Sequence, residues 1–109
     1  MKYKLPKSLR DKKRYIKFHI DSDSRFSREE VRRAFWDMML SFLGEKGSSK
    51  VNFKVSDWQE EGNIGIVRCS IDSVDDMIVC MKFIRDIQGN ATNMLVKGIS
   101  GTLKSLEKC

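Results

Sequence analysis

The strongest constraint on this fold is a strand-like alternation that is followed at once by a helix signal. Between residues 14 and 21, Ile16, Phe18 and Ile20 share one face, and the residues between them are polar or basic. Such alternation is typical of a half-buried strand. The first regular element is therefore predicted to be a strand with one side in the core.

The segment FSREEV predicts the start of a helix directly after this strand. Ser27 can cap the helix, and Glu30, three residues later, completes a capping box. We expect the helix to run from Arg28 to about Leu43 and to end at Gly44.

The remaining elements follow from the same periodicities and from turn residues. GEKGSSK indicates a loop, and QEEGN indicates a hairpin turn between two alternating segments. Ser73, followed by acidic residues, predicts a second helix that extends to about Ile87 and ends before Gly89. The other predicted elements are strands over residues 50–58, 64–71 and 91–102, and a short helical turn over Leu103 to Lys108.

The predicted order is β-α-β-β-α-β, an α+β fold of the ferredoxin-like or RRM-like type. Four antiparallel strands would form a sheet with two helices on one face, and the right-handed crossover rule gives the strand order 4-1-3-2. We expect residues 1–109 to form a single domain in which residues 1–13 are a basic N-terminal arm.

The positive charge is concentrated at the start of the chain. Residues 1–20 carry eight basic side chains and one acidic side chain, a balance of +7, whereas the whole chain has a net charge of +6. A basic block beside a near-neutral remainder predicts a polyanionic partner, either nucleic acid or an anionic membrane surface. The absence of an apolar run of roughly 20 residues disfavours the membrane.

The sequence offers no catalytic or metal-binding constellation. His19 is the single histidine, and no spacing brings a nucleophile to it. The three cysteines lack a paired motif, so we expect no zinc site and interpret them as reduced, intracellular thiols. We therefore predict no catalytic residues and no metal ligands in this chain.

Apolar surface beyond the needs of a core predicts a protein contact. The sheet-facing stripe predicted for the first helix consists of Ala34, Val31, Met38, Phe42 and Phe35, and the apolar arc of the helix continues past it. The open face of the third strand lacks an aromatic residue for base stacking. We expect these surplus apolar residues to meet a protein. The predicted interface residues are Trp36, Met39, Leu40, Leu43, Ile64 and Ile66.

Three segments, LPKSLRDKKRYIKF, GIVRCS and SGTLK, resemble the ribonuclease P protein component 2 family in its short archaeal form. The resemblance covers nearly the whole chain. It implies a subunit of the ribonucleoprotein that removes the 5′ leader from precursor tRNA in the cytoplasm. The catalytic centre of that ribonucleoprotein is RNA with bound Mg²⁺, so the polypeptide would bind no cofactor itself.

The resemblance also implies the partners of the chain. These are ribonuclease P RNA and the TIM-barrel-like ribonuclease P protein component 3, and self-association would give a heterotetramer. Contacts to RNA are expected from the basic segment before and within the first strand, and from two later cations. The predicted RNA-binding residues are Lys7, Arg10, Lys12, Lys13, Arg14, Lys17, Arg68 and Lys104.

Two other functions stay open on sequence grounds, because this fold does not select one function. A regulatory ferredoxin-like domain could bind a small molecule between protomers. An adaptor could use the basic segment to bind an acidic protein. Neither needs RNA, so the presence or absence of a bound RNA separates them from the first interpretation.

Overall fold

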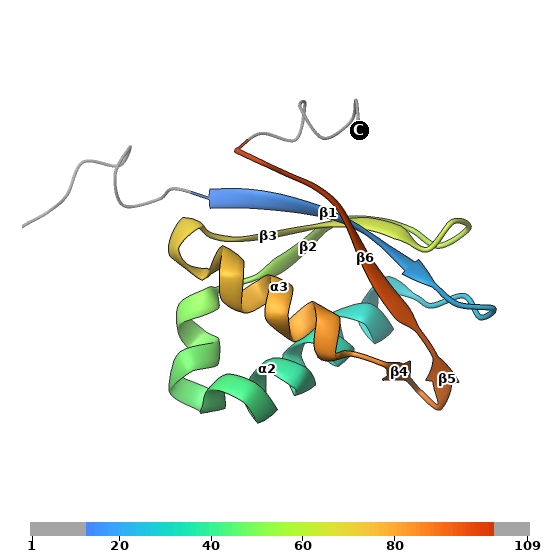
Figure 1. The fold of residues 1–109 in the computed structure, drawn as a ribbon, viewed down its shortest axis with the longest axis horizontal. Coiled ribbons are helices and arrows are strands. Elements are labelled where there is room, and N and C mark those ends of the chain that lie inside the picture. The colour runs from blue at the N-terminus through green and yellow to red at the C-terminus, as the bar shows by residue number, and fades with distance from the viewer. Residues whose placement is uncertain (1–12, 102–109) are drawn as a thin grey trace, which may run out of the picture.

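The computed structural model describes residues 13–101 and shows two helices on one face of a four-stranded sheet (Figure 1). The strand order is β2-β3-β1-β6, and all neighbouring strands are antiparallel. This confirms the predicted fold class and strand order. The main elements are β1 (Lys13–Asp21), α2 (Arg28–Val51), β2 (Lys54–Gln59), β3 (Ile64–Ser70), α3 (Val74–Phe83) and β6 (Asn93–Ser100), with a short 3-10 helix η1 (Ile71–Ser73) before α3.

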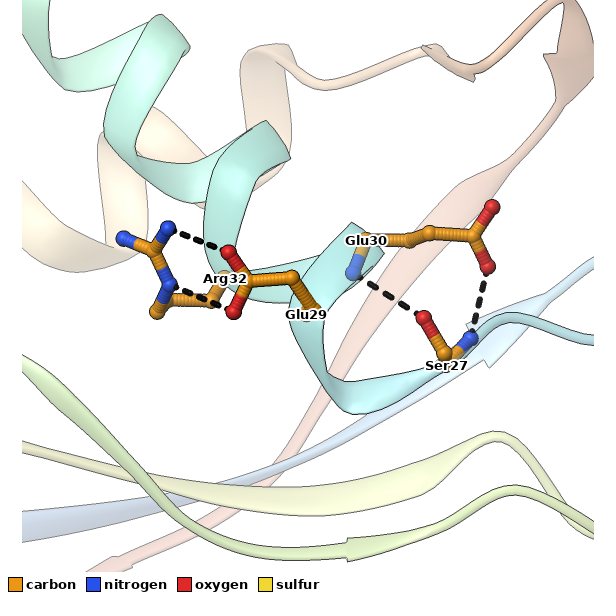
Figure 2. Close-up of polar contacts among 4 residues, drawn as sticks. All are labelled: Ser27, Glu29, Glu30 and Arg32. Carbon is orange, nitrogen blue, oxygen red and sulfur yellow. Dashed lines mark hydrogen bonds and ion pairs between the residues drawn. The ribbon is translucent and has the colours of Figure 1, made fainter.

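The first turn of α2 is fixed by the predicted capping box (Figure 2). The Glu30 amide donates a hydrogen bond to Ser27 Oγ at 3.2 Å, and the Ser27 amide donates to Glu30 Oε1 at 2.8 Å. Phe26 and Val31, on either side of the cap, are both buried. The two backbone donors are satisfied by side chains where no helical partner exists.

Gly44 bends α2 instead of ending it, so the predicted loop over residues 44–50 is wrong. Gly44 has φ 75° and ψ 176°, a conformation that is almost restricted to glycine, and the helix resumes after it and continues to Val51. Ser48 Oγ donates a hydrogen bond to the Gly44 carbonyl oxygen at 2.7 Å. The second strand consequently begins at Lys54, not at residue 50.

The second predicted helix is shorter than expected, because a tight hairpin takes over its last residues. α3 ends at Phe83, and the two-residue strands β4 (Asp86–Ile87) and β5 (Asn90–Ala91) follow. The turn between them places Gln88 and Gly89 at φ 53° and 81°. Two consecutive positive φ values match the tight turns that connect hairpin strands, so Gly89 serves a turn here, not a helix end.

The core lies between the sheet and the two helices. Ile16, Phe18 and Ile20 of β1 are fully buried, as their alternation predicts. Phe18 packs edge-on against Phe35 of α2, with ring centroids 5.3 Å apart, and stacks on Trp58 of β2 at 5.9 Å. The edge strand is thereby tied to the centre of the sheet and to α2.

Some expectations fall on parts of the chain that the structure does not describe. Apart from Lys13, the predicted basic arm lies outside residues 13–101, and so does the predicted turn over Leu103 to Lys108. Within the described range, neither helix combines the length and the apolar character that crossing a membrane requires.

Candidate nucleic-acid interface

The side of the sheet opposite the helices carries a row of polar and basic residues across three strands. Tyr15 of β1 lies opposite Arg68 of β3, and Arg68 lies opposite Lys54 of β2. Lys13 and Lys17 flank Tyr15 on the same face of β1, because successive strand residues alternate between faces. We call Lys13, Tyr15, Lys17, Lys54 and Arg68 the open-face cluster.

Arg68 lies at the centre of this cluster. Its side chain is half-buried, and its Nε is buried without a hydrogen-bond partner among the described residues. An unpaired buried donor costs about 1–3 kcal/mol. An anionic acceptor that drew the side chain outward would relieve this cost and pair with the guanidinium, so Arg68 is suited to bind a phosphate.

The aromatic residue in this row is Tyr15, which is half-buried between Arg68 on one side and Ser100 of β6 on the other. On the same face, Lys17 lies opposite Ile66, and Ile66 lies opposite Asp57 of β2. The positive charge is therefore concentrated at the end of the sheet where β1 begins. The arrangement suits binding of a phosphate backbone better than stacking of several bases.

Arg14 is separated from the open-face cluster, although it was predicted to act with its neighbours. It lies opposite Cys69 on the helix side of β1, and its Nη1 donates to the Lys13 carbonyl oxygen at 3.0 Å. A Cβ atom added at Gly101 would lie 3.3 Å from Arg14 Nη1, so the guanidinium lies at the end of β6. Of the other predicted RNA contacts, Lys7, Arg10, Lys12 and Lys104 lie outside the described residues.

Lys54 was absent from the predicted contacts, although the sequence contained a signal for it. The alternation of the second strand places Lys54 on the face opposite Val55, which is buried. The alternation does not reveal which residues of β2 and β3 lie opposite each other. The pairing that brings Lys54 beside Arg68 includes a register shift between Val55 and Asp57. Such irregularities in strand pairing are not readable from one sequence.

A second feature is a cleft of about 760 Å³ between α2 and β2. Arg28 Nη2 donates to the Val55 carbonyl oxygen, and this contact crosses from α2 to β2. Arg32 donates two hydrogen bonds to the Glu29 carboxylate, at 2.5 and 3.0 Å (Figure 2). These bonds lower the pKa of Glu29, so the carboxylate stays ionised and paired. The cleft is lined by Arg28, Glu29, Arg32, Trp36, Ser48, Asn52, Phe53, Lys54 and Val55.

The predicted protein-interface residues do not form one surface. Trp36 lines the cleft, and Leu40 and Leu43 are half-buried on α2, whereas Ile64 and Ile66 lie on the opposite side of the sheet. Ile64 is half-buried, and Ile66 is only 7% exposed.

Met39 is 0% exposed, which contradicts its assignment to a contact surface. The face of α2 that packs on the sheet is centred on Val31, Phe35 and Met39. The predicted inner stripe included Val31 and Phe35 but omitted Met39. Phe42, which was placed in that stripe, is 47% exposed instead. Its ring contacts that of Phe83 on α3, with centroids 5.6 Å apart, so an apolar patch lies where the two helices meet.

The buried cysteines are poor nucleophiles. Cys69 and Cys80 are buried free thiols, and burial raises the pKa of Cys69 to about 11 and shifts that of Cys80 upward. A thiol with a raised pKa supplies little thiolate near neutral pH. Across residues 13–101, His, Cys, Asp and Glu form no group of three that could hold a metal ion.

The sequence matches a protein-family model and several proteins that belong to a named family. The model of the Rpp14/Pop5 family matches residues 14–109. Ribonuclease P protein component 2 of Pyrococcus furiosus is 39% identical over 104 residues, which are 95% of this chain and 87% of that protein. The corresponding protein of Archaeoglobus fulgidus is 33% identical over 105 residues, 95% of this chain and 93% of that protein.

A solved structure has the same fold at much lower sequence identity. A chain in a cryo-EM structure of yeast ribonuclease MRP superimposes with a TM-score of 0.67 and 13% identity, over 84% of this chain and 76% of that chain. The likeness extends the fold beyond the archaeal relatives. With a family model that matches nearly the whole chain and relatives that match it over most of their length, this protein belongs to the Rpp14/Pop5 family.

Proposed function

We propose that this chain is a protein subunit of ribonuclease P and supports the catalytic RNA in removing the 5′ leader from precursor tRNA. The observation that carries the proposal is the match to relatives named ribonuclease P protein component 2 over 95% of the chain. The open-face cluster supports it independently, because it presents cations on the side of the sheet that no described helix covers (Figure 1).

The role of the protein would be to hold RNA rather than to perform the chemistry. Hydrolysis of a phosphodiester needs aligned phosphates and metal ions, which folded RNA with Mg²⁺ can supply. Lys13, Lys54 and Arg68 would neutralise phosphates, and each neutralised phosphate releases counter-ions. The chain would thereby stabilise close approach of RNA strands whose charges repel one another.

We infer further that the chain acts with protein partners in the cytoplasm. The partners would be ribonuclease P protein component 3 and a second copy of this chain, and the exposed patch of Phe42 and Phe83 offers apolar area for such a contact. Free Cys69 and Cys80 suit a reducing compartment. The experiment for these partners is the composition and mass of the complex that the tagged chain brings out of cells.

The function is tested by reconstituting leader removal with and without the full chain, and by measuring RNA affinity at several salt concentrations. A triple variant with Lys13, Lys54 and Arg68 changed to alanine should bind ribonuclease P RNA more weakly. Its log–log salt slope should fall by about 2–3 units, because each phosphate contact contributes nearly one unit.

The matched control changes three exposed cations on the helical side, Lys46, Lys82 and Arg85, to alanine. This control should leave the affinity and the slope close to those of the unaltered chain. Equal losses in the two triple variants would show that only net charge matters and would reject the open-face cluster. Leader removal that proceeds equally well without the chain would reject the proposed function.

A further inference from the structure

The cleft between α2 and β2 combines an aromatic wall with cations. Arg28, Arg32 and Trp36 are spaced four residues apart, so they form one stripe along α2. Phe53 and Lys54 line the cleft from the strand side. The segment of α2 after the Gly44 bend also lines the cleft, through Ser48. At about 760 Å³ the cleft is within the size range of small-ligand sites.

The aromatic wall is held firmly by the core. The rings of Trp36 and Phe53 are stacked, with centroids 6.3 Å apart and an interplanar angle of 26°. Phe53 also packs edge-on against Phe35, which is fully buried, at 6.2 Å. Both Trp36 and Phe53 are half-buried at the cleft, so part of each ring remains accessible. An aromatic wall that is anchored in this way offers ring surface on which a nucleobase can stack.

The other tryptophan of the described residues, Trp58, has a structural role that Trp36 does not share. Trp58 stacks on Phe18, and its Nε1 donates to the Phe26 carbonyl oxygen at 2.8 Å. Trp58 thus has a structural function in joining β2 to the start of α2. Trp36 instead faces the cleft, where its partner ring is also exposed in part.

The charge at the cleft favours an anionic occupant. Three of its lining residues are cations, and its one carboxylate, Glu29, is already neutralised by Arg32. Arg28 uses Nη2 to bind the Val55 carbonyl oxygen and keeps other donors. Lys54 makes no ion pair with any described residue. An anion in the cleft would therefore meet Lys54 and Arg28 without displacing an ion pair.

Lys54 also connects the cleft to the open-face cluster. It lines the cleft, and in the sheet it lies beside Arg68. Positive charge therefore continues from the open face, around the edge strand β2, to the aromatic wall. A nucleic acid can use both parts of this path, since its phosphates would contact the cations and a base would stack on the aromatic wall. An acidic peptide would use the cations but would leave the aromatic wall without a stacking partner.

We propose that the cleft between α2 and β2 binds one unstacked nucleotide of a single-stranded RNA segment, with its base against Trp36 and Phe53 and its phosphate beside Lys54 and Arg28. This inference rests on the proposed function, since it needs an RNA partner, and it adds a second place of contact with a different mode of binding. The open-face cluster would bind the backbone alone, and the cleft would bind a base as well.

The test uses the full chain and an oligouridine of about six nucleotides that contains one photoreactive 4-thiouridine. Irradiation should crosslink the thiouridine to Trp36 or Phe53, as identified by mass spectrometry of the digested protein. Affinity for the same oligonucleotide, measured by fluorescence anisotropy, should fall about 5-fold to 150-fold in Trp36→Leu, which corresponds to loss of one stacked base. Trp36→Phe should recover most of the affinity.

Val79→Ala provides the control, because Val79 is an exposed apolar residue on α3 that lies outside the cleft. Its affinity should equal that of the unaltered chain, and thermal unfolding should show that each variant is folded. If Trp36→Leu fails to fold, the crosslink position and the weaker binding of Arg28→Ala decide the question, because Arg28 lines the cleft and is not part of the open-face cluster.

Two outcomes would overturn the nucleotide site. One is crosslinking confined to the open face together with unchanged affinity in Trp36→Leu. The other is displacement of the oligonucleotide by an acidic peptide that binds the cleft more tightly. In either case the reconstituted leader removal and the salt slope of the triple variant still test the proposed function, so the two failures are distinguishable.

Discussion

The two faces of the sheet use the same strands for opposite purposes. On β1, Ile16, Phe18 and Ile20 are fully buried against the helices, while Tyr15 and Lys17, which alternate with them, are half-buried on the open face. Substitutions on the covered face should therefore change stability, and substitutions on the open face should change binding. The difference teaches that one strand can be constrained by packing and by a ligand at alternate residues.

The largest expected effect is on the covered face. Phe18→Ala should lower the free energy of unfolding by about 3–5 kcal/mol, because it removes a fully buried ring that contacts Phe35 and Trp58. Tyr15→Ala, in the same strand but on the open face, should cost much less. Denaturant titration followed by circular dichroism measures both, and equal losses would mean that the two faces are not energetically distinct.

A smaller effect should appear at high pH, also on the covered face. Burial raises the pKa of Cys69 from an ordinary 9.0 to about 11, so the unfolded chain loses this proton at lower pH than the folded chain. The free energy of unfolding should therefore fall as the pH rises from about 9 to about 11. Unfolding measured across this range should show a weaker decline in Cys69→Ala, and an identical decline in both proteins would contradict the assignment to this thiol.

The smallest effect on stability is expected on the open face. The triple variant of Lys13, Lys54 and Arg68 should lower the free energy of unfolding by no more than about 1 kcal/mol, because charges near the surface contribute little and the change at Arg68 removes a buried donor that has no partner. Thermal unfolding of the variant without RNA measures this. A loss of unfolding free energy as large as that of Phe18→Ala would mean that the cluster supports the fold. Weaker RNA binding by the triple variant could then result from unfolding and would not identify an RNA contact.

Much of the covered face was predictable because local signals determine it. Alternation identified the buried side of β1, and the capping box identified the start of α2 to the residue. The two wrongly predicted helix ends have one cause, which is that glycine serves several backbone conformations. Gly44 was interpreted as a helix end but forms a bend, and Gly89 was interpreted in the same way but forms a hairpin turn.

For the candidate sites, the sequence predicted on which face some residues lie but not which residues lie beside one another. Alternation placed Lys17 and Arg68 on the open face, but the neighbours of Arg68 depend on register between strands far apart in the sequence. The direction in which α2 faces the sheet is likewise a tertiary property, which is why Met39 was placed at the surface and Phe42 in the core. The cleft could not be foreseen, because it depends on the bend at Gly44 and on the packing of α2 against β2.

The bend at Gly44 also divides α2 into two units with separate local stabilities. The first unit packs on the sheet through Val31, Phe35 and Met39. The second unit contributes Val51 to the core, and its hydrogen bonds include those from Ser48 Oγ to the Gly44 carbonyl oxygen and from Ser70 Oγ to the carbonyl oxygens of Lys50 and Val51. Segments with fewer buried contacts open at lower free energy than the global fold. Amide exchange should therefore be faster after Gly44 than before it, and the Ser48 side of the cleft belongs to the part of the helix that opens first.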